Sequence, residues 1–261
     1  MSAIDISLQQ MGILYLLLLI PISIFALYRL KLVGKTVSAV LRMTVQLSLV
    51  GLYLKYLFEW NNFWLNCAWV LVMLVAANLN ILKQAGLSIR SFLPGTLSAT
   101  GIATILVVGV FLALVVRPEP VYDARYLVPI TGMLLGNCLR ANIVGLERFF
   151  SSVRENQKEF MTYLYLGASL QEACLPHLHK ALRAALVPHI STMATLGIVS
   201  LPGMMTGQIL GGGNPVVAIK YQLAIMVAIL STSALGVFLN LRVGMHVAFD
   251  EFHRLRTDIL A

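Results

Sequence analysis

The chain has 261 residues, of which 59% are hydrophobic and only 11% are charged, and its mean hydropathy is +0.84. Soluble domains average about 45–50% apolar and about 25% charged residues, so this composition excludes a soluble globular protein. It also excludes a disordered chain, because such chains are poor in large apolar residues. The composition predicts an all-α polytopic integral membrane protein, with a single transmembrane domain over residues 1–261.

Seven stretches are long and apolar enough to cross the bilayer as helices, for which about 20 residues suffice. They cover residues 11–28, 39–58, 63–82, 97–116, 127–147, 191–210 and 219–241. Their apolar residues run continuously instead of alternating with a period of two, which favours helices over barrel strands. Basic residues directly follow the first stretch and none precedes it, so we expect a true span there and not a cleaved signal peptide.

The positions of Lys and Arg predict the orientation. With the N-terminus outside, fifteen of the nineteen basic residues fall in cytoplasmic segments, and four fall outside: Lys55, Arg117, Arg125 and Lys220. This bias follows the positive-inside rule and predicts a cytoplasmic C-terminus in the plasma membrane, the inner membrane of a bacterium. Membrane topology therefore explains the net charge of +8, and we expect the chain to contact lipid and not nucleic acid.

One cytoplasmic loop is long, residues 148–190, and two helices fit it. The first is predicted over 147–166, ending at Gly167 as a left-handed cap. The second starts with Ser169 as N-cap and Glu172 three residues later, a capping box. Its apolar stripe consists of leucines at helical spacing: Leu175, Leu178, Leu182 and Leu186. We expect Pro176 to kink this helix and Pro188 to end it.

Such a pair of helices has two interpretations. It is either an amphipathic pair on the membrane surface or a rigid element, held by the glycine hinge, that docks a cytoplasmic partner. His177 and His179 lie two residues apart and point in different directions on a helix, so we expect surface histidines there and not a metal site.

Glycines at four-residue spacing allow close helix contacts in two spans. They are Gly132 and Gly136 in the fifth span, and Gly203, Gly207 and Gly211 in the sixth. Pro202 removes a backbone donor, so the sixth helix is expected to bend or break at Pro202–Gly203. Such breaks often mark a pathway.

Polar and sulfur-bearing side chains gather in the same two spans. Thioethers suit soft metal ions, and the candidate pathway residues are Met133, Asn137, Met204, Met205 and Gln208. Packing or lipid contact is the alternative interpretation for each methionine. Arg140 is a charge inside its apolar run, which indicates either function or a place at the cytoplasmic end of the span. The cysteines Cys67, Cys138 and Cys174 are scattered and are best interpreted as small buried hydrophobes.

Residues 184–223, from AALVPHISTMATLG to GGGNPVVAIKYQL, closely resemble the signature of the FetB-type permeases, the membrane subunits of ABC transporters associated with iron export. The segments PITGMLLGN (129–137), YLGASLQEA (165–173) and LRMTVQL, with Arg42 and Gln46, extend the resemblance over nearly the whole chain.

The resemblance implies that two copies of the chain pair with two separate ATP-binding subunits, which use ATP and Mg²⁺. It also implies that the loop at Gly167, Ala168, Ser169 and Glu172 couples the permease to the ATPase, although the importer-type EAA start is missing here. Bacterial relatives are associated with iron efflux. Plant relatives are associated with aluminium tolerance and, in one complex, with nucleotide-sugar transport, so the resemblance leaves the cargo open.

The chain is not expected to hydrolyse ATP or bind a cofactor itself. Gly34-Lys35-Thr36 is preceded by Arg29 where a P-loop needs glycine. An intramembrane enzyme is disfavoured because the chain carries no GxSxG or HExxH motif, and a secondary transporter is disfavoured because its acids lie at or beyond the span ends. Metal export and organic-anion export by an ABC permease both remain open.

Overall fold

The computed structural model describes residues 6–250 and 253–256, so the acids Asp5, Glu251 and Asp258 lie outside the described part of the chain. Within the described ranges, almost all regular structure is helical. Six helical segments there are long and apolar enough to cross a membrane: Gln9–Leu27, Val33–Trp60, Phe63–Gln84, Ile89–Val116, Ala124–Glu155 and Pro215–Ala248. The predicted all-α membrane fold is confirmed.

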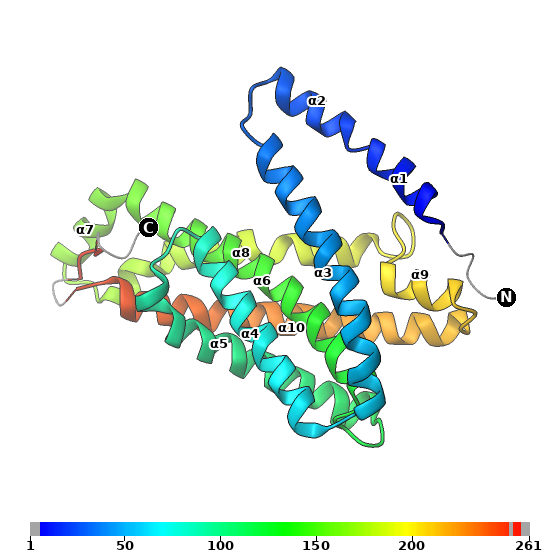
Figure 1. The fold of residues 1–261 in the computed structure, drawn as a ribbon. Helices are drawn as coiled ribbons and strands as arrows, with labels where there is room; N and C mark the ends of the chain where they lie inside the picture. Colours follow the sequence, from blue (N-terminus) through cyan, green and yellow to red (C-terminus); the bar gives the residue numbers. More distant parts are fainter. Residues whose placement is uncertain (1–5, 251–252, 257–261) are drawn as a thin grey trace.

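Four helices form the central bundle (Figure 1). They are α4 (Phe63–Gln84), α5 (Ile89–Val110, continued by the π-helix η1 over Phe111–Val116), α6 (Ala124–Glu155) and α10 (Pro215–Ala248). Helix α10 packs along α5 and α6, and α4 packs on α6 and α5. Glycines bring α10 close to α6: a Cβ atom at Gly236 would lie 2.6 Å from the Cys138 sulfur, and one at Gly145 would lie 2.8 Å from Val237.

The bundle buries polar side chains as well as apolar ones. Asn240 on α10 donates to Asn142 Oδ1 on α6 at 2.7 Å and to Thr100 Oγ1 on α5 at 3.0 Å. The Thr100 hydroxyl in turn donates to Asn78 Oδ1 on α4 at 3.1 Å. All four side chains are fully buried. We call them the polar clamp, because they join the four bundle helices by side-chain hydrogen bonds.

The first three helices form an arm: α1 (Leu8–Leu16) and α2 (Leu19–Leu27) lie apart from the bundle, and α3 (Val33–Trp60) leads from them across it (Figure 1). The predicted first span is therefore present, but it is interrupted. Pro21 accounts for the interruption, because it has no amide hydrogen to donate to Leu17 and its ring crowds that carbonyl.

The arm contacts the bundle near the end of α3. There Leu57 is fully buried against Ala124 and Val128 of α6, and the Tyr53 ring lies 4.3 Å from the Trp69 ring of α4. In the most apolar windows of α1–α2 and of α3, no residue is buried. The arm is therefore attached at one end and uncovered along most of its length.

Two further corrections concern the predicted cytoplasmic loop. The predicted helix over 147–166 is instead the end of α6 followed by a separate helix, α7 (Gln157–Tyr165), because the chain turns at Asn156. The next helix, α8 (Leu170–Thr195), does not end at Pro188. A proline inside a helix removes one backbone hydrogen bond, and packing of α8 on α6 and α10 offsets that loss.

The predicted span over 191–210 is broken, as Pro202 led us to expect. Its chain consists of the last turn of α8, an irregular segment over 196–202, and the short helix α9 (Gly203–Leu210). The expected break at Pro202–Gly203 is present, with Pro202 as the N-cap of α9, and it extends back to Leu196. Gly197 has φ of +85° there, a conformation that suits glycine. Together α8 and α9 return the chain to the end of the bundle where α10 begins (Figure 1).

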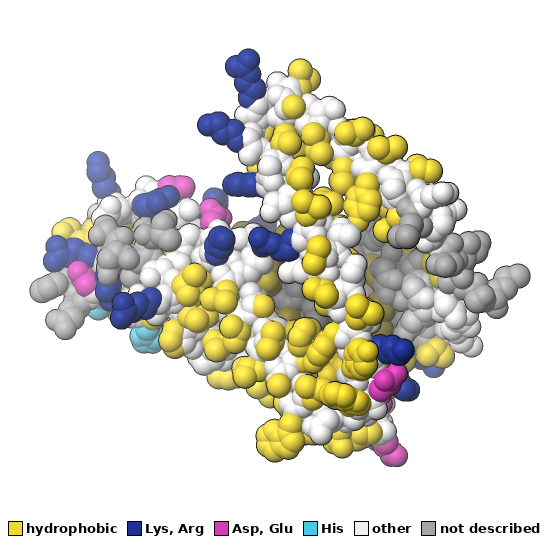
Figure 2. Space-filling model, in the orientation of Figure 1, with side chains coloured by type: hydrophobic (Ala, Val, Ile, Leu, Met, Phe, Trp, Pro, Cys, Tyr) yellow, Lys and Arg dark blue, Asp and Glu magenta, His cyan; other side chains and the backbone are white. Residues whose placement is uncertain are grey.

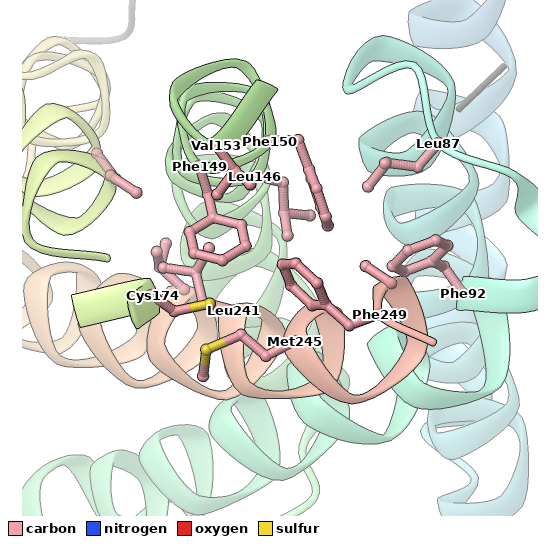
Figure 3. Packing of buried hydrophobic residues seen from close by; sticks show 14 of the residues in the cluster. Leu87, Phe92, Leu146, Phe149, Phe150, Val153, Cys174, Leu241, Met245 and Phe249 are labelled. Carbon is pink, nitrogen blue, oxygen red and sulfur yellow. The ribbon is translucent and has the colours of Figure 1, made fainter. Parts of the chain in front are cut away.

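Basic side chains mark one end of the molecule. On the visible face, Lys and Arg gather around α7 and at the turn between α2 and α3, hydrophobic side chains cover much of the bundle, and some charged side chains appear near the end of α3 (Figure 2). We call this the basic end, which the sequence predicts to be cytoplasmic, and the opposite one the far end. Within the basic end, Phe92 of α5 and Phe149 and Phe150 of α6 pack in one apolar cluster with residues of α8 and α10 and with Phe249, which directly follows α10 (Figure 3).

Candidate coupling turn and transport pathway

The turn between α7 and α8 is built as the sequence predicts. Gly167 has φ of +93°, and the amide of Ala168 donates to the carbonyl of Tyr163 at 3.0 Å. This backbone pattern closes a helix with a left-handed residue, which favours glycine because a side chain would be strained there. The predicted end of the first helix at Gly167 is confirmed.

The capping box at the start of α8 is also confirmed. The Ser169 amide and hydroxyl donate to Glu172 Oε2 at 2.8 and 2.7 Å, and the Glu172 amide donates back to the Ser169 hydroxyl at 3.3 Å. These hydrogen bonds favour the carboxylate, so they lower the pKa of Glu172 below its ordinary value. Turn and cap together make a short, rigid connection between α7 and α8.

The start of α8 is anchored to α6 by a histidine that sequence reasoning placed on the surface. His177 is only 2% exposed, and its Nδ1 lies 2.8 Å from the Ser152 hydroxyl of α6. Burial, followed by the charge of Lys180, lowers the pKa of His177. His179 is exposed, as expected.

The buried face of α8 also differs from the predicted leucine stripe. Small residues, Ala173, Cys174, Ala181 and Ala185, are buried there, whereas Leu175 is half exposed. Small side chains let α8 approach α6 closely, and the other three leucines of the stripe pack beside them. Burial raises the pKa of the Cys174 thiol to about 12, which agrees with its interpretation as an inert buried hydrophobe.

Large apolar side chains are exposed at the tip of the turn. Tyr165 is 81% exposed and Leu166 is 80% exposed, next to Gly167. The turn lies at the basic end, where lipid tails do not cover it if that end is cytoplasmic. Exposed aromatic and aliphatic groups on a rigid support are suited to docking another protein.

The structure brings together some of the predicted pathway residues. Met133 of α6 and Met204 of α9 pack against the same apolar cluster, and Met205 and Gln208 are half-buried on α9. Asn137 donates to the carbonyl of Met133 at 2.8 Å, within α6. Among the described residues, no group of three His, Cys, Asp or Glu side chains could hold a metal ion.

The predicted packing glycines differ in their surroundings. A Cβ atom at Gly132 would lie 3.2 Å from Met73 of α4, so this glycine allows a close contact. A Cβ atom at Gly136, Gly203 or Gly207 would meet nothing within 4 Å, and Gly211 lies just after α9 as its C-cap. Gly203 and Gly207 therefore make no close helix contact within this chain.

Sequence reasoning missed how two sets of polar residues are arranged. One is the polar clamp, whose asparagines stand out within apolar runs but whose partners cannot be read from one sequence. The other is a recess on α3 lined by Arg42, Gln46 and, from α4, Trp69. Arg140 is exposed on α6 and lies near His189 of α8.

The comparisons with known proteins agree with this architecture. The model of the uncharacterised protein family UPF0014 matches residues 8–249. A UPF0014 membrane protein of Synechocystis is 34% identical over 79% of this chain and 80% of its own length. The Escherichia coli protein named "Probable iron export permease protein FetB" is 28% identical over 100% of this chain and 97% of its own.

A plant relative, the Arabidopsis thaliana protein ALUMINUM SENSITIVE 3, is 27% identical over 89% of this chain and 84% of its own length. No solved structure matches the chain. The family match across the whole transmembrane region, together with the multi-span helical fold, leads to one conclusion. The chain belongs to the UPF0014 family of multi-pass membrane proteins, which includes a relative named as an iron export permease.

Proposed function

We propose that the chain is the membrane permease subunit of an ABC transporter that exports iron or a related metal ion, with ATP hydrolysed by a separate subunit. The rigid turn between α7 and α8 is the observation that carries this proposal. Its exposed Tyr165 and Leu166 provide an apolar contact for the ATPase, and the capping box holds their support in place. A second copy of the chain completes the transporter.

Helix α8 provides a mechanical route from this turn to the pathway. It runs without interruption for 26 residues, about 39 Å at 1.5 Å per residue. Its first half is anchored on α6 through His177, and its far end leads into the irregular segment before α9. A displacement of the docked turn would therefore pass along α8 to the irregular segment over 196–202, which leads to Met204 of α9, and Met204 packs with Met133.

Docking of the ATPase subunit is tested with arginine substitutions at the two ends of α7, where both residues are exposed. Leu166→Arg should reduce co-purification of the ATPase subunit at least ten-fold, because it places a charge in the apolar contact. Gln157→Arg, at the start of α7, is the matched control and should leave co-purification unchanged. Equal binding by both variants would remove the turn from the interface.

Coupling is tested by changing the turn itself. Gly167→Pro cannot adopt the φ of +93° seen here, and Ala168→Arg adds a long charged side chain beside it. Both variants should retain folded protein and lose ATP-driven transport. Unaltered transport by either folded variant would contradict the proposed coupling role. Transport that continues without any ATPase subunit would instead indicate a secondary transporter.

The metal cargo is tested through the sulfur atoms of α9. Replacing Met204 and Met205 together by leucine keeps the volume and removes both thioethers. Metal transport should fall if these sulfurs contact the cargo, and the rate of transport at limiting metal concentration measures it. Undiminished transport would exclude them as ligands.

An organic anion, such as a nucleotide sugar, is the second candidate cargo, and one observation favours it. Arg42 and Arg140 are both exposed within helices that cross the membrane, and the sequence has no acid between Asp123 and Glu147 to offset Arg140. Positive charges attract phosphates and repel bare metal cations. Replacing each arginine by glutamine should weaken transport of an anion and should not weaken transport of Fe²⁺.

A further inference from the structure

An apolar cavity of about 510 Å³ lies between α4, α5 and α6 in the far half of the bundle. Its volume is within the range of small-molecule sites, about 300–1,000 Å³. Leu71 of α4 and Ile105 of α5 line it and are more than half exposed, so the cavity opens onto the face of the bundle that lipid surrounds. An occupant therefore comes from the bilayer.

The order of the lining residues along the helices gives the cavity a direction. On α4 they run from Phe63 to Leu74, and on the antiparallel α5 and its continuation η1 they run from Leu112 back to Thr104. Phe63 and Tyr122 lie at the far-end rim, with their rings 5.5 Å apart edge to face. Eleven residues of helix span about 16 Å, so the cavity reaches from the rim to about the middle of a hydrocarbon core about 30 Å thick.

Two threonines line the inner end of this cavity, and their buried hydroxyl groups have no hydrogen-bond partner. They are Thr104 of α5 and Thr131 of α6, which are 1% and 0% exposed and are the innermost lining residues of their helices. A buried polar group without a partner costs about 1–3 kcal/mol. Threonine in a helix has two common χ1 rotamers, so rotation can exchange the hydroxyl and methyl positions at the wall.

We propose that the cavity binds an uncharged long-chain lipophile of the bilayer, with a hydroxyl or carbonyl oxygen at the end that enters first. The described lining residues include no charged side chain, which disfavours a charged head group inside. The long apolar walls match a hydrocarbon chain, and the two threonines supply the hydrogen bonds for its oxygen. The α5 helix widens into the π-helix η1 at the outer part of the cavity, a distortion that is frequent at functional sites.

The experiment uses the full chain in lipid nanodiscs and a photoactivatable diazirine analogue of 1-dodecanol. Labelling should map to α4, α5 and α6. Unlabelled 1-dodecanol should compete about five-fold better than dodecane, because only the alcohol can bond to the threonines. Decylubiquinone carries carbonyl oxygens instead of a hydroxyl group. Whether it or 1-dodecanol competes better with the label shows whether the cavity prefers a carbonyl or a hydroxyl oxygen.

Two sets of variants make the test specific. A Cβ atom at Gly109 would meet nothing within 4 Å, so Gly109→Leu fills the cavity and should abolish labelling, whereas Gly51→Leu on α3 is the matched control. Thr104→Val with Thr131→Val should remove the preference for alcohol over dodecane while leaving the chain folded.

Equal competition by dodecane and 1-dodecanol in the wild-type chain would overturn the proposal, and so would labelling that persists in folded Gly109→Leu. Stronger competition by a phospholipid than by the alcohol would also overturn it. Because the measurement involves neither ATP nor cargo, its outcome is independent of the proposed transport function.

Discussion

The bundle and the arm satisfy their polar side chains in opposite ways. In the bundle, Asn240, Asn142, Thr100 and Asn78 bond to one another across four helices and are fully buried. In the arm, the hydroxyls of α3 bond mostly to carbonyls of the preceding turn, and a hydrogen bond between the Tyr15 and Thr44 hydroxyls joins α1 to α3. These four bundle residues therefore find their partners within the chain, although the buried hydroxyls of Thr104 and Thr131 in the same bundle have none.

The arm, in contrast, is completed by its surroundings. Arg42 and Gln46 are exposed on a helix that crosses the membrane, where a charge costs about 2.5–3.5 kcal/mol at the bilayer centre unless it finds water, a head group or another protein. The comparison teaches that packing within the chain fixes the bundle, whereas the position of the arm depends on lipid or on the second copy.

The largest effect is expected where the bundle helices approach most closely. Gly236→Leu places its Cβ atom 2.6 Å from the Cys138 sulfur and 3.3 Å from the Asn142 amide, so α6 and α10 must separate. Overpacking of this kind costs about 1–3 kcal/mol or more, and we expect little folded protein by size-exclusion chromatography. Gly51→Leu in the arm, where space is open, should elute as wild type. A similar loss of folded protein in both variants would contradict the difference in packing between the bundle and the arm.

A smaller loss is expected when the polar clamp is opened without adding bulk. Asn240→Leu removes two interhelical hydrogen bonds and leaves the Asn142 carbonyl oxygen without its donor, at a cost of about 1–2 kcal/mol. Gln46→Leu in the arm should leave the stability of the detergent-solubilised chain within about 0.5 kcal/mol of wild type. Thermal melting in detergent measures both, and an Asn240→Leu melting temperature equal to that of wild type would show that the clamp is dispensable.

The smallest effect concerns α8, which joins the bundle through His177. Burial and the charge of Lys180 outweigh Glu159 and lower the pKa of His177 from its ordinary value near 6.5. The unfolded chain therefore binds a proton more readily than the folded one. The contribution of neutral His177 to stability is complete above about pH 6.5 and is lost as the pH falls below it.

Melting temperatures between pH 7.5 and pH 5 check this sign. The wild type and the exposed control His179→Gln should both lose stability on acidification. His177→Gln should lose less, because it has no group to protonate at that position. A steeper acid loss in His177→Gln than in the control would contradict the buried neutral histidine.

Local rules predicted the parts of this molecule that depend on local chemistry. The left-handed Gly167 and the box between Ser169 and Glu172 each involve residues within one turn, so their pattern determines their geometry. The end of α8 could not be predicted in this way, because packing on α6 and α10 carries the helix past Pro188. His177 was misplaced for the same reason: its partner Ser152 is 25 residues earlier.

The candidate pathway depends still more on distant contacts. That Met133 and Met204 share an apolar cluster, while Gly203 and Gly207 face open space, follows from how α9 returns to α10 after the irregular segment. The hydropathy of the sequence does not show how the chain turns between α8, α9 and α10. The break in the sixth span was therefore predicted at Pro202–Gly203, but its extension back to Leu196 was not.

Transport by the reconstituted complex tests the central claim most directly. Inside-out vesicles that contain this chain with its ATPase subunit should accumulate Fe²⁺ when ATP is added, with Mn²⁺, Zn²⁺ and a nucleotide sugar assayed beside it. The account predicts iron accumulation that stops when either the ATPase subunit or ATP is left out. ATP hydrolysis by the intact complex without movement of any metal would contradict the metal cargo and leave the anion. Iron accumulation that needs no ATP would contradict the assignment to an ABC transporter.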